Sequence, residues 1–322
     1  MEVTRNSGRL YLRGMGTALV TPFKEDKSVD YERLKVLVQR QIDCGADFLV
    51  VLGTTAETPT LSEEEQDNII NTCIEVNQGR LPLVAGVSYN GTLQAIDRLQ
   101  SMPREGVDAA LVVCPYYNKP SQEGLYQHFK AIAEVSPLPI LLYNIPARTA
   151  VNMLPDTTLR LAQDCPNIIG IKEASGIVSQ IDLVAKRRPE GFCVLAGDDT
   201  ITFPLMSMGV DGVISVIGNA FPAEFGEMVH LIQKEDFKSA LKIHHLFKEL
   251  YSLLFVDGNP AGVKCAMAHL HLLEEYLRLP LVPMQSPNRE RMLELMQELC
   301  NNEVIKIHLA DGSAICDQLS KK

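Results

Sequence analysis

The chain has 322 residues, of which 46% are hydrophobic and 22% charged, and its formal net charge is −10 at pH 7. This composition is typical of a globular fold and excludes fibrous and disordered chains, and the negative charge gives no general attraction for nucleic acid or anionic lipid. No apolar run approaches the roughly 20 residues that a membrane-spanning helix needs, and the opening stretch, MEVTRNSGRL, lacks the apolar centre of a signal peptide. The eight cysteines show no Cys-x-x-Cys pair, so we expect mostly buried thiols in a cytoplasmic protein.

Short apolar runs alternate with amphipathic segments up to residue 221. The runs that we expect to form strands are residues 17–20, 48–52, 83–87, 109–114, 140–143, 168–172, 193–196 and 212–216. Helices are predicted between them, for example over 31–44 and 121–135, and Ser62 with Glu65 forms the capping box of another. Strands that are apolar on both faces and separated by helices predict a (β/α)8 barrel, the TIM-barrel fold. The alternative, a doubly wound open sheet, normally carries a glycine-rich turn after its first strand, and residues 17–23 contain no glycine.

Beyond residue 221 only helical patterns occur, over residues 223–233, 237–254, 262–277 and 288–299. Prolines separate the later helices, because proline cannot continue a helix from the preceding turn. We therefore expect a catalytic barrel over residues 1–221 and a C-terminal helical extension over 222–300. Residues 301–322 show weak periodicity, and the sequence does not indicate which structure they form.

The carboxyl ends of the strands should build the active site, because barrels of this type place it there. Those ends carry hydroxyls, phenols, one lysine and one arginine, but none of the seven histidines. A metal-dependent barrel enzyme would need histidine ligands at this position, so we expect no metal and no cofactor. Asp198 and Asp199 follow the seventh strand, and their negative charge disfavours a phosphate site there.

Lys172 is the most informative single residue. It ends the sixth predicted strand on the same face as Gly170, whose small size we expect to leave room for a ligand beside the amine. Apolar walls favour a neutral amine, which is the nucleophile that forms a Schiff base with a carbonyl. The alternative is a lysine that reaches solvent or pairs with Glu173.

Residues at neighbouring strand ends fit the same chemistry. Tyr143 ends the preceding strand, and its phenol suits proton transfer beside a Schiff base, although a core tyrosine is an equal alternative. Arg148 suits a clamp for a substrate carboxylate, although a surface ion pair is more frequent for a single arginine. Thr54 and Thr55 suit carboxylate binding, although a plain turn uses the same residues. Together they predict a site for small carbonyl acids.

Five motifs carry a resemblance to a known family: GTTAE at 53–57, PYYNKP at 115–120, YNIPART at 143–149, GIKEA at 170–174 and GDD at 197–199. In order and spacing they resemble the pyruvate-dependent class I aldolases that include N-acetylneuraminate lyase, and among these the dihydrodipicolinate synthases. The resemblance covers residues 12–300. The motif at 53–57 has Ala56 where the family usually has glycine, which would cost roughly 1 kcal/mol if the backbone there had a positive φ.

The resemblance implies catalytic roles for four residues. Lys172 forms the imine with pyruvate, and Tyr143, Thr55 and Tyr117 form a proton relay. The tyrosine that matches Tyr117 reaches the site from a neighbouring subunit in this family. The resemblance therefore implies a homo-oligomer, a tight dimer that usually pairs into a tetramer.

It also implies which residues hold the substrates. Thr54 and Thr55 bind the carboxylate of pyruvate, and the backbones of Gly197 and Ile214 line its site. Arg148 engages the carboxylate of L-aspartate 4-semialdehyde.

This arginine favours the condensation of pyruvate with L-aspartate 4-semialdehyde, on the route to diaminopimelate and lysine. Related lyases for sugar acids or in a hydroxyproline pathway, which use the same lysine, are the alternative within the family. A non-catalytic barrel that binds keto acids is the alternative from another class.

Lysine-inhibited relatives use residues that match Thr58, Pro59, Glu63, Gln66, Asn90, Gln94 and Tyr116. Because Gln94 stands where inhibited enzymes commonly have glutamate, we expect weak inhibition by L-lysine.

Overall fold

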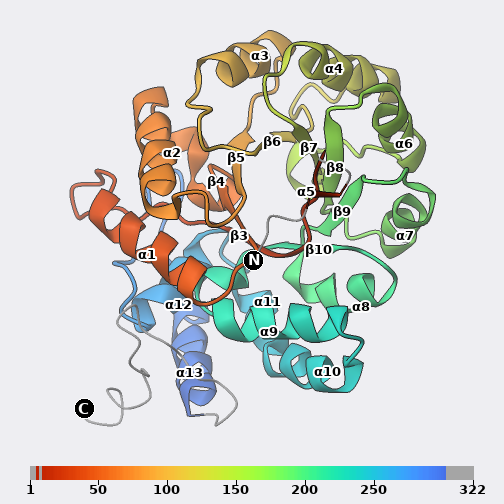
Figure 1. Cartoon of the computed structure of the whole chain (residues 1–322). Coiled ribbons are helices and arrows are strands. Elements are labelled where there is room, and N and C mark those ends of the chain that lie inside the picture. The colour runs from red at the N-terminus through yellow and green to blue at the C-terminus, as the bar shows by residue number, and fades with distance from the viewer. Residues whose placement is uncertain (1–4, 7–8, 302–322) are drawn as a thin grey trace.

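Eight parallel strands form a closed barrel at the centre of the molecule (Figure 1). The computed structural model describes residues 5–6 and 9–301. Around the barrel the strand order is β10-β3-β4-β5-β6-β7-β8-β9, so each strand lies beside its sequence neighbours and β10 closes the ring against β3. A short antiparallel pair, β1 (Arg5–Asn6) and β2 (Arg9–Leu10), precedes it. The barrel strands are β3 (Gly14–Ala18), β4 (Phe48–Val51), β5 (Leu83–Val87), β6 (Ala109–Val113), β7 (Ile140–Asn144), β8 (Ile168–Glu173), β9 (Cys193–Ala196) and β10 (Gly212–Ser215).

Helices surround the strands. The outer ring contains α1 (Tyr31–Asp43), α2 (Glu63–Asn77), α3 (Thr92–Ser101), α4 (Gln122–Val135), α6 (Pro155–Asp164), α7 (Val178–Arg187), α8 (Thr202–Ser207) and α9 (Pro222–Gln233). The later helices are α10 (Phe237–Leu246), α11 (Lys248–Leu253), α12 (Ala261–His269) and α13 (Asn288–Cys300), with α13 packed against α11 and α12. Short helical turns follow four strands: α5 (Pro146–Thr149), η1 (Thr54–Ala56), η3 (Asp199–Ile201) and η4 (Ile217–Asn219).

The predicted fold class is confirmed, and most predicted elements match within two residues. The first strand is the exception among the strands, since it begins at Gly14 rather than at residue 17. Glycines do not count as apolar in a sequence pattern, but here a Cβ on Gly16 would collide with the ring of Phe48 on β4. The close approach of β3 and β4 therefore explains why this strand begins with glycines, which the apolar pattern did not identify as part of a strand.

Two predicted helices of the C-terminal region were too long. The helix predicted over 237–254 divides at Phe247, whose ring is fully buried against Phe221 and Tyr251. The helix predicted over 262–277 ends at His269, because His271 adopts a left-handed backbone with φ of +56°. The predicted capping box is confirmed: Glu65 N donates to Ser62 Oγ at 3.2 Å, and Ser62 N donates to Glu65 Oε2 at 3.0 Å.

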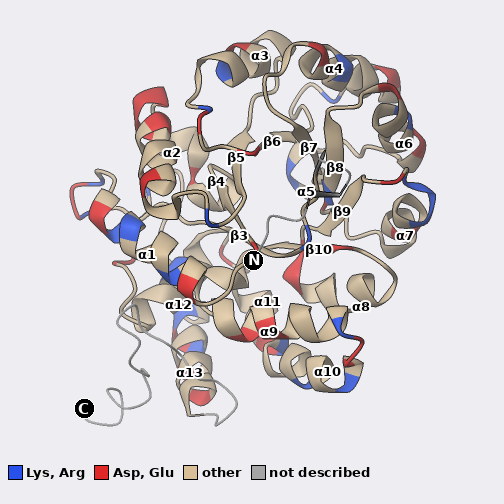
Figure 2. Ribbon diagram, in the orientation of Figure 1, with Lys and Arg blue, Asp and Glu red and all other residues tan. Residues whose placement is uncertain are grey.

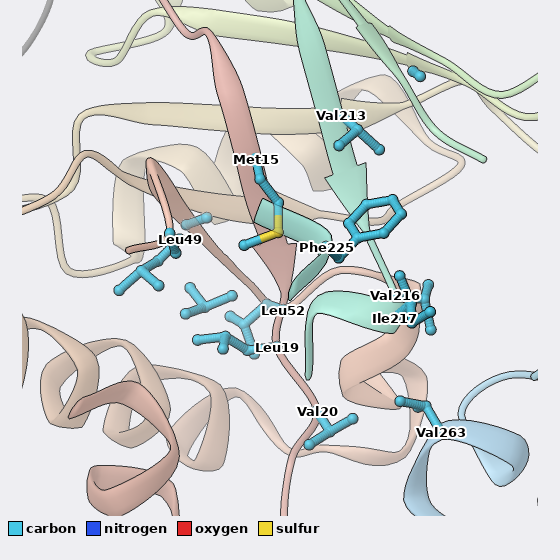
Figure 3. Close-up of a cluster of buried hydrophobic side chains, with 14 of the residues drawn as sticks. Met15, Leu19, Val20, Leu49, Leu52, Val213, Val216, Ile217, Phe225 and Val263 are labelled. Atoms are coloured by element: carbon cyan, nitrogen blue, oxygen red, sulfur yellow. The ribbon is translucent and has the colours of Figure 1, made fainter. Parts of the chain in front are cut away.

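Two layers of apolar side chains hold the barrel together. One fills its interior and includes Phe48, Leu111 and Ile214. The other lies between the strands and the helices, where Met15, Val213 and Phe225 meet (Figure 3). Because both faces of each strand are buried, the strands carry continuous apolar runs rather than alternating ones.

Helix α9 completes the ring by packing on β3, and Val263 of α12 lies in the same apolar cluster as Phe225 of α9 (Figure 3). The division of the chain into a barrel and an appendage at residues 221 and 222 stays a prediction. Of the predicted tail, residues 302–322 lie outside the described residues.

Charged residues lie mainly on the outer helices and loops, and the central strands are largely free of them (Figure 2). Over residues 5–6 and 9–301, no helix combines the length and the apolar character that crossing a membrane would require. Six of the seven cysteines in this part of the chain are buried.

Candidate active site

Lys172 and Tyr143 lie side by side at the carboxyl ends of β8 and β7. They are paired in the parallel register of these strands, and Lys172 Nζ lies 4.3 Å from the centre of the Tyr143 ring. Each side chain is only 5% exposed. The amine therefore faces an aromatic ring in a nearly closed space at the end of the barrel where such enzymes bind substrate.

The alternative in which Lys172 pairs with Glu173 does not occur. Strand alternation turns Glu173 to the other face of β8, where its carboxylate accepts hydrogen bonds from Asn144 Nδ2 at 3.1 Å and Gln180 Nε2 at 3.1 Å. The backbone N of Ser175 donates to the same carboxylate at 2.8 Å. Burial raises the pKa of Glu173 against the effect of these hydrogen bonds. No carboxylate within the described residues forms an ion pair with Lys172, so its amine is available for chemistry.

Gly170 does not leave room for a ligand beside the amine, which corrects the prediction from sequence. A Cβ on Gly170 would lie 2.2 Å from Cys193 Sγ, so the neighbouring strand already fills that position. A Cβ on Gly197 would lie 3.1 Å from Lys172 Cε and 2.6 Å from the Cβ of Ala174. Glycine at 197 therefore lets Ala174 and the side chain of Lys172 lie close to the backbone of residue 197.

Thr54 and Thr55 lie in the 3₁₀ turn η1, which follows β4; we call residues 53–57 the threonine turn. Thr54 Oγ1 lies 3.5 Å from Tyr143 Oη. Thr55, which is 2% exposed, instead accepts a hydrogen bond from Asn259 Nδ2 at 2.9 Å. The hydroxyl that the structure brings to Tyr143 is thus that of Thr54, not that of Thr55 as the predicted relay had it.

The left-handed residue of the threonine turn is Glu57, with φ of +57°, and not Ala56. Ala56 has an ordinary helical backbone inside η1, so its replacement of the usual glycine causes no strain. A residue with a side chain loses roughly 1–2 kcal/mol in the left-handed region, so other contacts must hold Glu57 in place.

Those contacts come from the C-terminal region. The carboxylate of Glu57 forms an ion pair with Lys264 Nζ at 2.6 Å, and both side chains are fully buried. Glu57 Oε2 also accepts the backbone N–H of Arg278 at 3.0 Å, and Lys264 Nζ donates to the carbonyl of Tyr276 at 2.9 Å. The charged groups of Lys264 and Arg278 lie 4.3 and 4.6 Å from the ring centre of Phe23. Helix α12 and the loop that follows it therefore hold the side chain of Glu57, and with it the threonine turn, in place.

The backbone amides after β10 are already occupied. Val216 N and Ile217 N donate to Asp199 Oδ2 at 3.0 and 2.9 Å. Complete burial raises the pKa of Asp199 to about 6. A phosphate could not use these two amides while Asp199 holds them. Within the described residues, no group of three or more His, Cys, Asp or Glu side chains is placed to hold a metal ion.

The remaining predicted residues lie at different depths. Ile214 is 1% exposed and lines the barrel interior. Arg148, on the short helix α5 just after β7, is exposed, and no described residue forms an ion pair with it. Tyr117 is 88% exposed with φ of +74°, and within the described chain it makes no hydrogen bond to Tyr143, Thr54 or Thr55.

Sequence reasoning missed Asn259 and Lys264. Asn259 lies 204 residues after Thr55, and Lys264 lies 207 residues after Glu57. No periodicity or local motif connects residues so far apart. The one available signal was the acidic Glu57 in a turn that is otherwise uncharged, since a buried carboxylate needs a partner.

Comparisons with known proteins show the family to which the chain belongs. Residues 11–299 match the model of the dihydrodipicolinate synthetase family. A relative from Phocaeicola vulgatus, named 4-hydroxy-tetrahydrodipicolinate synthase, is 58% identical over 288 residues, which are 89% of this chain and 97% of the relative. The crystal structure of dihydrodipicolinate synthase from Aquifex aeolicus has a TM-score of 0.86 at 41% identity and covers 89% of this chain and 98% of its own. The enzyme from Acinetobacter baumannii, solved in complex with pyruvate, has a TM-score of 0.86 at 40% identity with the same coverage. The chain therefore belongs to the dihydrodipicolinate synthetase family.

Proposed function

We propose that this chain condenses pyruvate with L-aspartate 4-semialdehyde to give 4-hydroxy-tetrahydrodipicolinate. The observation that carries the proposal is the pair Lys172 and Tyr143, buried side by side with the Thr54 hydroxyl 3.5 Å from the phenol. The names of the relatives support the same reaction.

The chemistry begins with the attack of Lys172 Nζ on the ketone carbon of pyruvate. Water leaves, an imine forms, and loss of a methyl proton gives the enamine. The enamine carbon attacks the aldehyde, whose oxygen takes up a proton. The substrate amine then attacks the imine carbon, closes the ring and frees Lys172, so that one water is lost overall. In this proposal Tyr143 and Thr54 move the protons of these steps, which their hydroxyl separation of 3.5 Å supports.

The proposal also assigns the residues that bind the substrates. Thr54 and Thr55 bind the carboxylate of pyruvate, and the backbones of Gly197 and Ile214 line its site. Arg148 is exposed at the rim without an acidic partner among the described residues, as a clamp for the second carboxylate requires.

A second copy of the chain completes the site in this proposal. The exposed Tyr117 and the 37% exposed Tyr116 beside it form an aromatic edge that suits a contact with another copy. We propose that Tyr117 reaches the partner's Tyr143 and Thr54 within a tight dimer, which pairs into a tetramer. We also propose a cytoplasmic location, since the seven cysteines of the described part are free thiols.

Two experiments test the proposed function. Borohydride reduction in the presence of pyruvate should trap a stable adduct on Lys172, and its absence would exclude the Schiff-base mechanism. A panel of aldehydes then distinguishes the synthase from the related lyases. The synthase should prefer L-aspartate 4-semialdehyde, whereas a lyase for sugar acids or in a hydroxyproline pathway should prefer a different aldehyde, such as a polyhydroxylated one. A keto-acid-binding barrel without catalytic function would show turnover with none of them.

A further inference from the structure

Asn259 contacts the threonine turn from the other end of the sequence. It lies between α11 and α12, and its side chain is 5% exposed. Its Nδ2 donates to Thr55 Oγ1 at 2.9 Å, while its Oδ1 is buried without a hydrogen-bond partner among the described residues. A buried amide that has only one partner, at the active site, needs an explanation.

The contact determines what the Thr55 hydroxyl can do. A hydroxyl has one hydrogen to donate and two lone pairs that accept. Asn259 occupies a lone pair, and no described residue accepts the hydrogen of Thr55. The hydroxyl is therefore left as a donor, which is the role that binding of a carboxylate needs.

The helix that follows Asn259 makes this contact rigid. Pro260 caps α12, and Lys264 of the same helix forms the buried ion pair with Glu57. The start of α12 thus touches the threonine turn at two points, one on a hydroxyl and one on a carboxylate. A hydrogen bond between rigid elements holds its geometry better than one on a mobile loop.

We propose that Asn259 is a positioning residue, which orients the Thr55 hydroxyl as a donor to the carboxylate of pyruvate. The inference rests on the proposed function and adds to it a residue outside the barrel strands. Asn259 acts through Thr55, so its effect must disappear when the hydroxyl is absent.

A double-mutant cycle on Asn259→Ala and Thr55→Val measures this dependence, with kcat and KM for pyruvate as readouts. Loss of an oriented hydrogen bond to a charged group should raise KM for pyruvate roughly ten- to a hundredfold in each single variant. We expect kcat to change much less, and Asn259→Ala to add nothing further when Thr55 is already valine.

Asn77→Ala is the matched control. Asn77 is 1% exposed, and its Nδ2 donates to the carbonyl of Leu81 at 2.7 Å, at the amino end of the strands and so opposite to the site. It should lower stability without changing KM for pyruvate. If Asn259→Ala behaves like this control, or if its effect on KM adds in full to that of Thr55→Val, then Asn259 is merely structural and the inference is overturned.

Two further measurements keep the test decisive. If Asn259→Ala does not fold, Asn259→Asp preserves the shape but replaces the donor with an acceptor, and an unchanged KM for pyruvate in that variant overturns the inference. Borohydride trapping with pyruvate in the wild-type enzyme tests the proposed function by itself. If the wild-type enzyme is not trapped, the mechanism is refuted. If the wild-type enzyme is trapped normally but Asn259→Ala leaves KM for pyruvate unchanged, only the role of Asn259 is refuted.

Discussion

The ion pair between Glu57 and Lys264 leads to a quantitative prediction for Lys264→Met. Methionine keeps the approximate length of the side chain but removes its charge and both of its hydrogen bonds, at 2.6 Å to Glu57 and 2.9 Å to Tyr276. The carboxylate of Glu57 is then left fully buried with the backbone N–H of Arg278 as its remaining donor. We expect the free energy of unfolding to fall by about 3–5 kcal/mol.

The magnitude follows from two opposing terms. With an effective dielectric constant of about 20, opposite charges 2.6 Å apart attract by about 6 kcal/mol. Against this stands the cost of removing the ammonium from water, and burial lowers the pKa of Lys264 to about 8 despite the attraction of Glu57. Lys264→Met removes the cost of burying the ammonium, but the cost of burying the carboxylate of Glu57 remains. The double variant Glu57→Gln with Lys264→Met removes both charges and should recover most of the loss.

Urea unfolding followed by circular dichroism measures these changes, with all variants at one protein concentration because an oligomer's stability depends on it. Arg187→Met is the control, since it breaks an ion pair on the surface. Arg187 Nη1 lies 3.0 Å from Asp156 Oδ1, and the two side chains are 52% and 85% exposed. That pair should contribute at most about 1 kcal/mol. If Lys264→Met costs no more than Arg187→Met, or if the double variant is less stable than the single one, the reasoning is wrong.

Four further outcomes are expected. Lys172→Ala should lower kcat by several orders of magnitude and abolish borohydride trapping, and near-normal turnover would exclude the Schiff base. Arg148→Ala should raise KM for aspartate semialdehyde far more than for pyruvate, whereas equal changes would make it structural. Burial raises the pKa of Glu224 from 4.5 to about 7, so the folded state binds this proton more tightly than the unfolded state and stability falls as the pH rises from 4.5 to 7. In urea unfolding, the free energy of unfolding of Glu224→Gln should therefore exceed that of the wild type by up to roughly 3 kcal/mol at pH 8, but not at pH 4.5. Turnover should respond little to tens of millimolar L-lysine, because Gln94 offers no charge to its ammonium, and half-inhibition at sub-millimolar lysine would contradict this.

The sequence predicts the barrel well because its signals are local. Eight apolar runs separated by amphipathic helices leave few alternatives, and the Ser62 capping box fixes one helix start to the residue. Local patterns fail where spatial neighbours decide the outcome. Gly170 and Gly197 look alike in the sequence, but the space at Gly170 is filled by Cys193 of the next strand, whereas Gly197 lies against Ala174 and the side chain of Lys172.

The same limit applies to the threonine turn. The sequence does not distinguish the two adjacent threonine hydroxyls. Only the folded structure shows that Thr54 lies near Tyr143 and that Thr55 contacts Asn259. The partner of Glu57 was equally hidden, because Lys264 lies on a helix whose placement against the barrel no local pattern encodes. Strand alternation and strand ends were enough to predict that Lys172 and Tyr143 lie at the carboxyl ends of neighbouring strands. Their catalytic roles were implied only by the resemblance to the family.

The distance along the chain between Glu57 and Lys264 also sets an order of events during translation. The threonine turn emerges from the ribosome first, and Lys264 follows 207 residues later, which at about 5–20 residues per second is roughly 10–40 s. Throughout that interval Glu57 lacks the ion pair with Lys264 and the hydrogen bond from Arg278 that hold it in the folded protein. Under the proposed mechanism, the nascent chain therefore carries Lys172 before the partner of Glu57 has been made, and the amine can react productively with pyruvate only after α12 has docked.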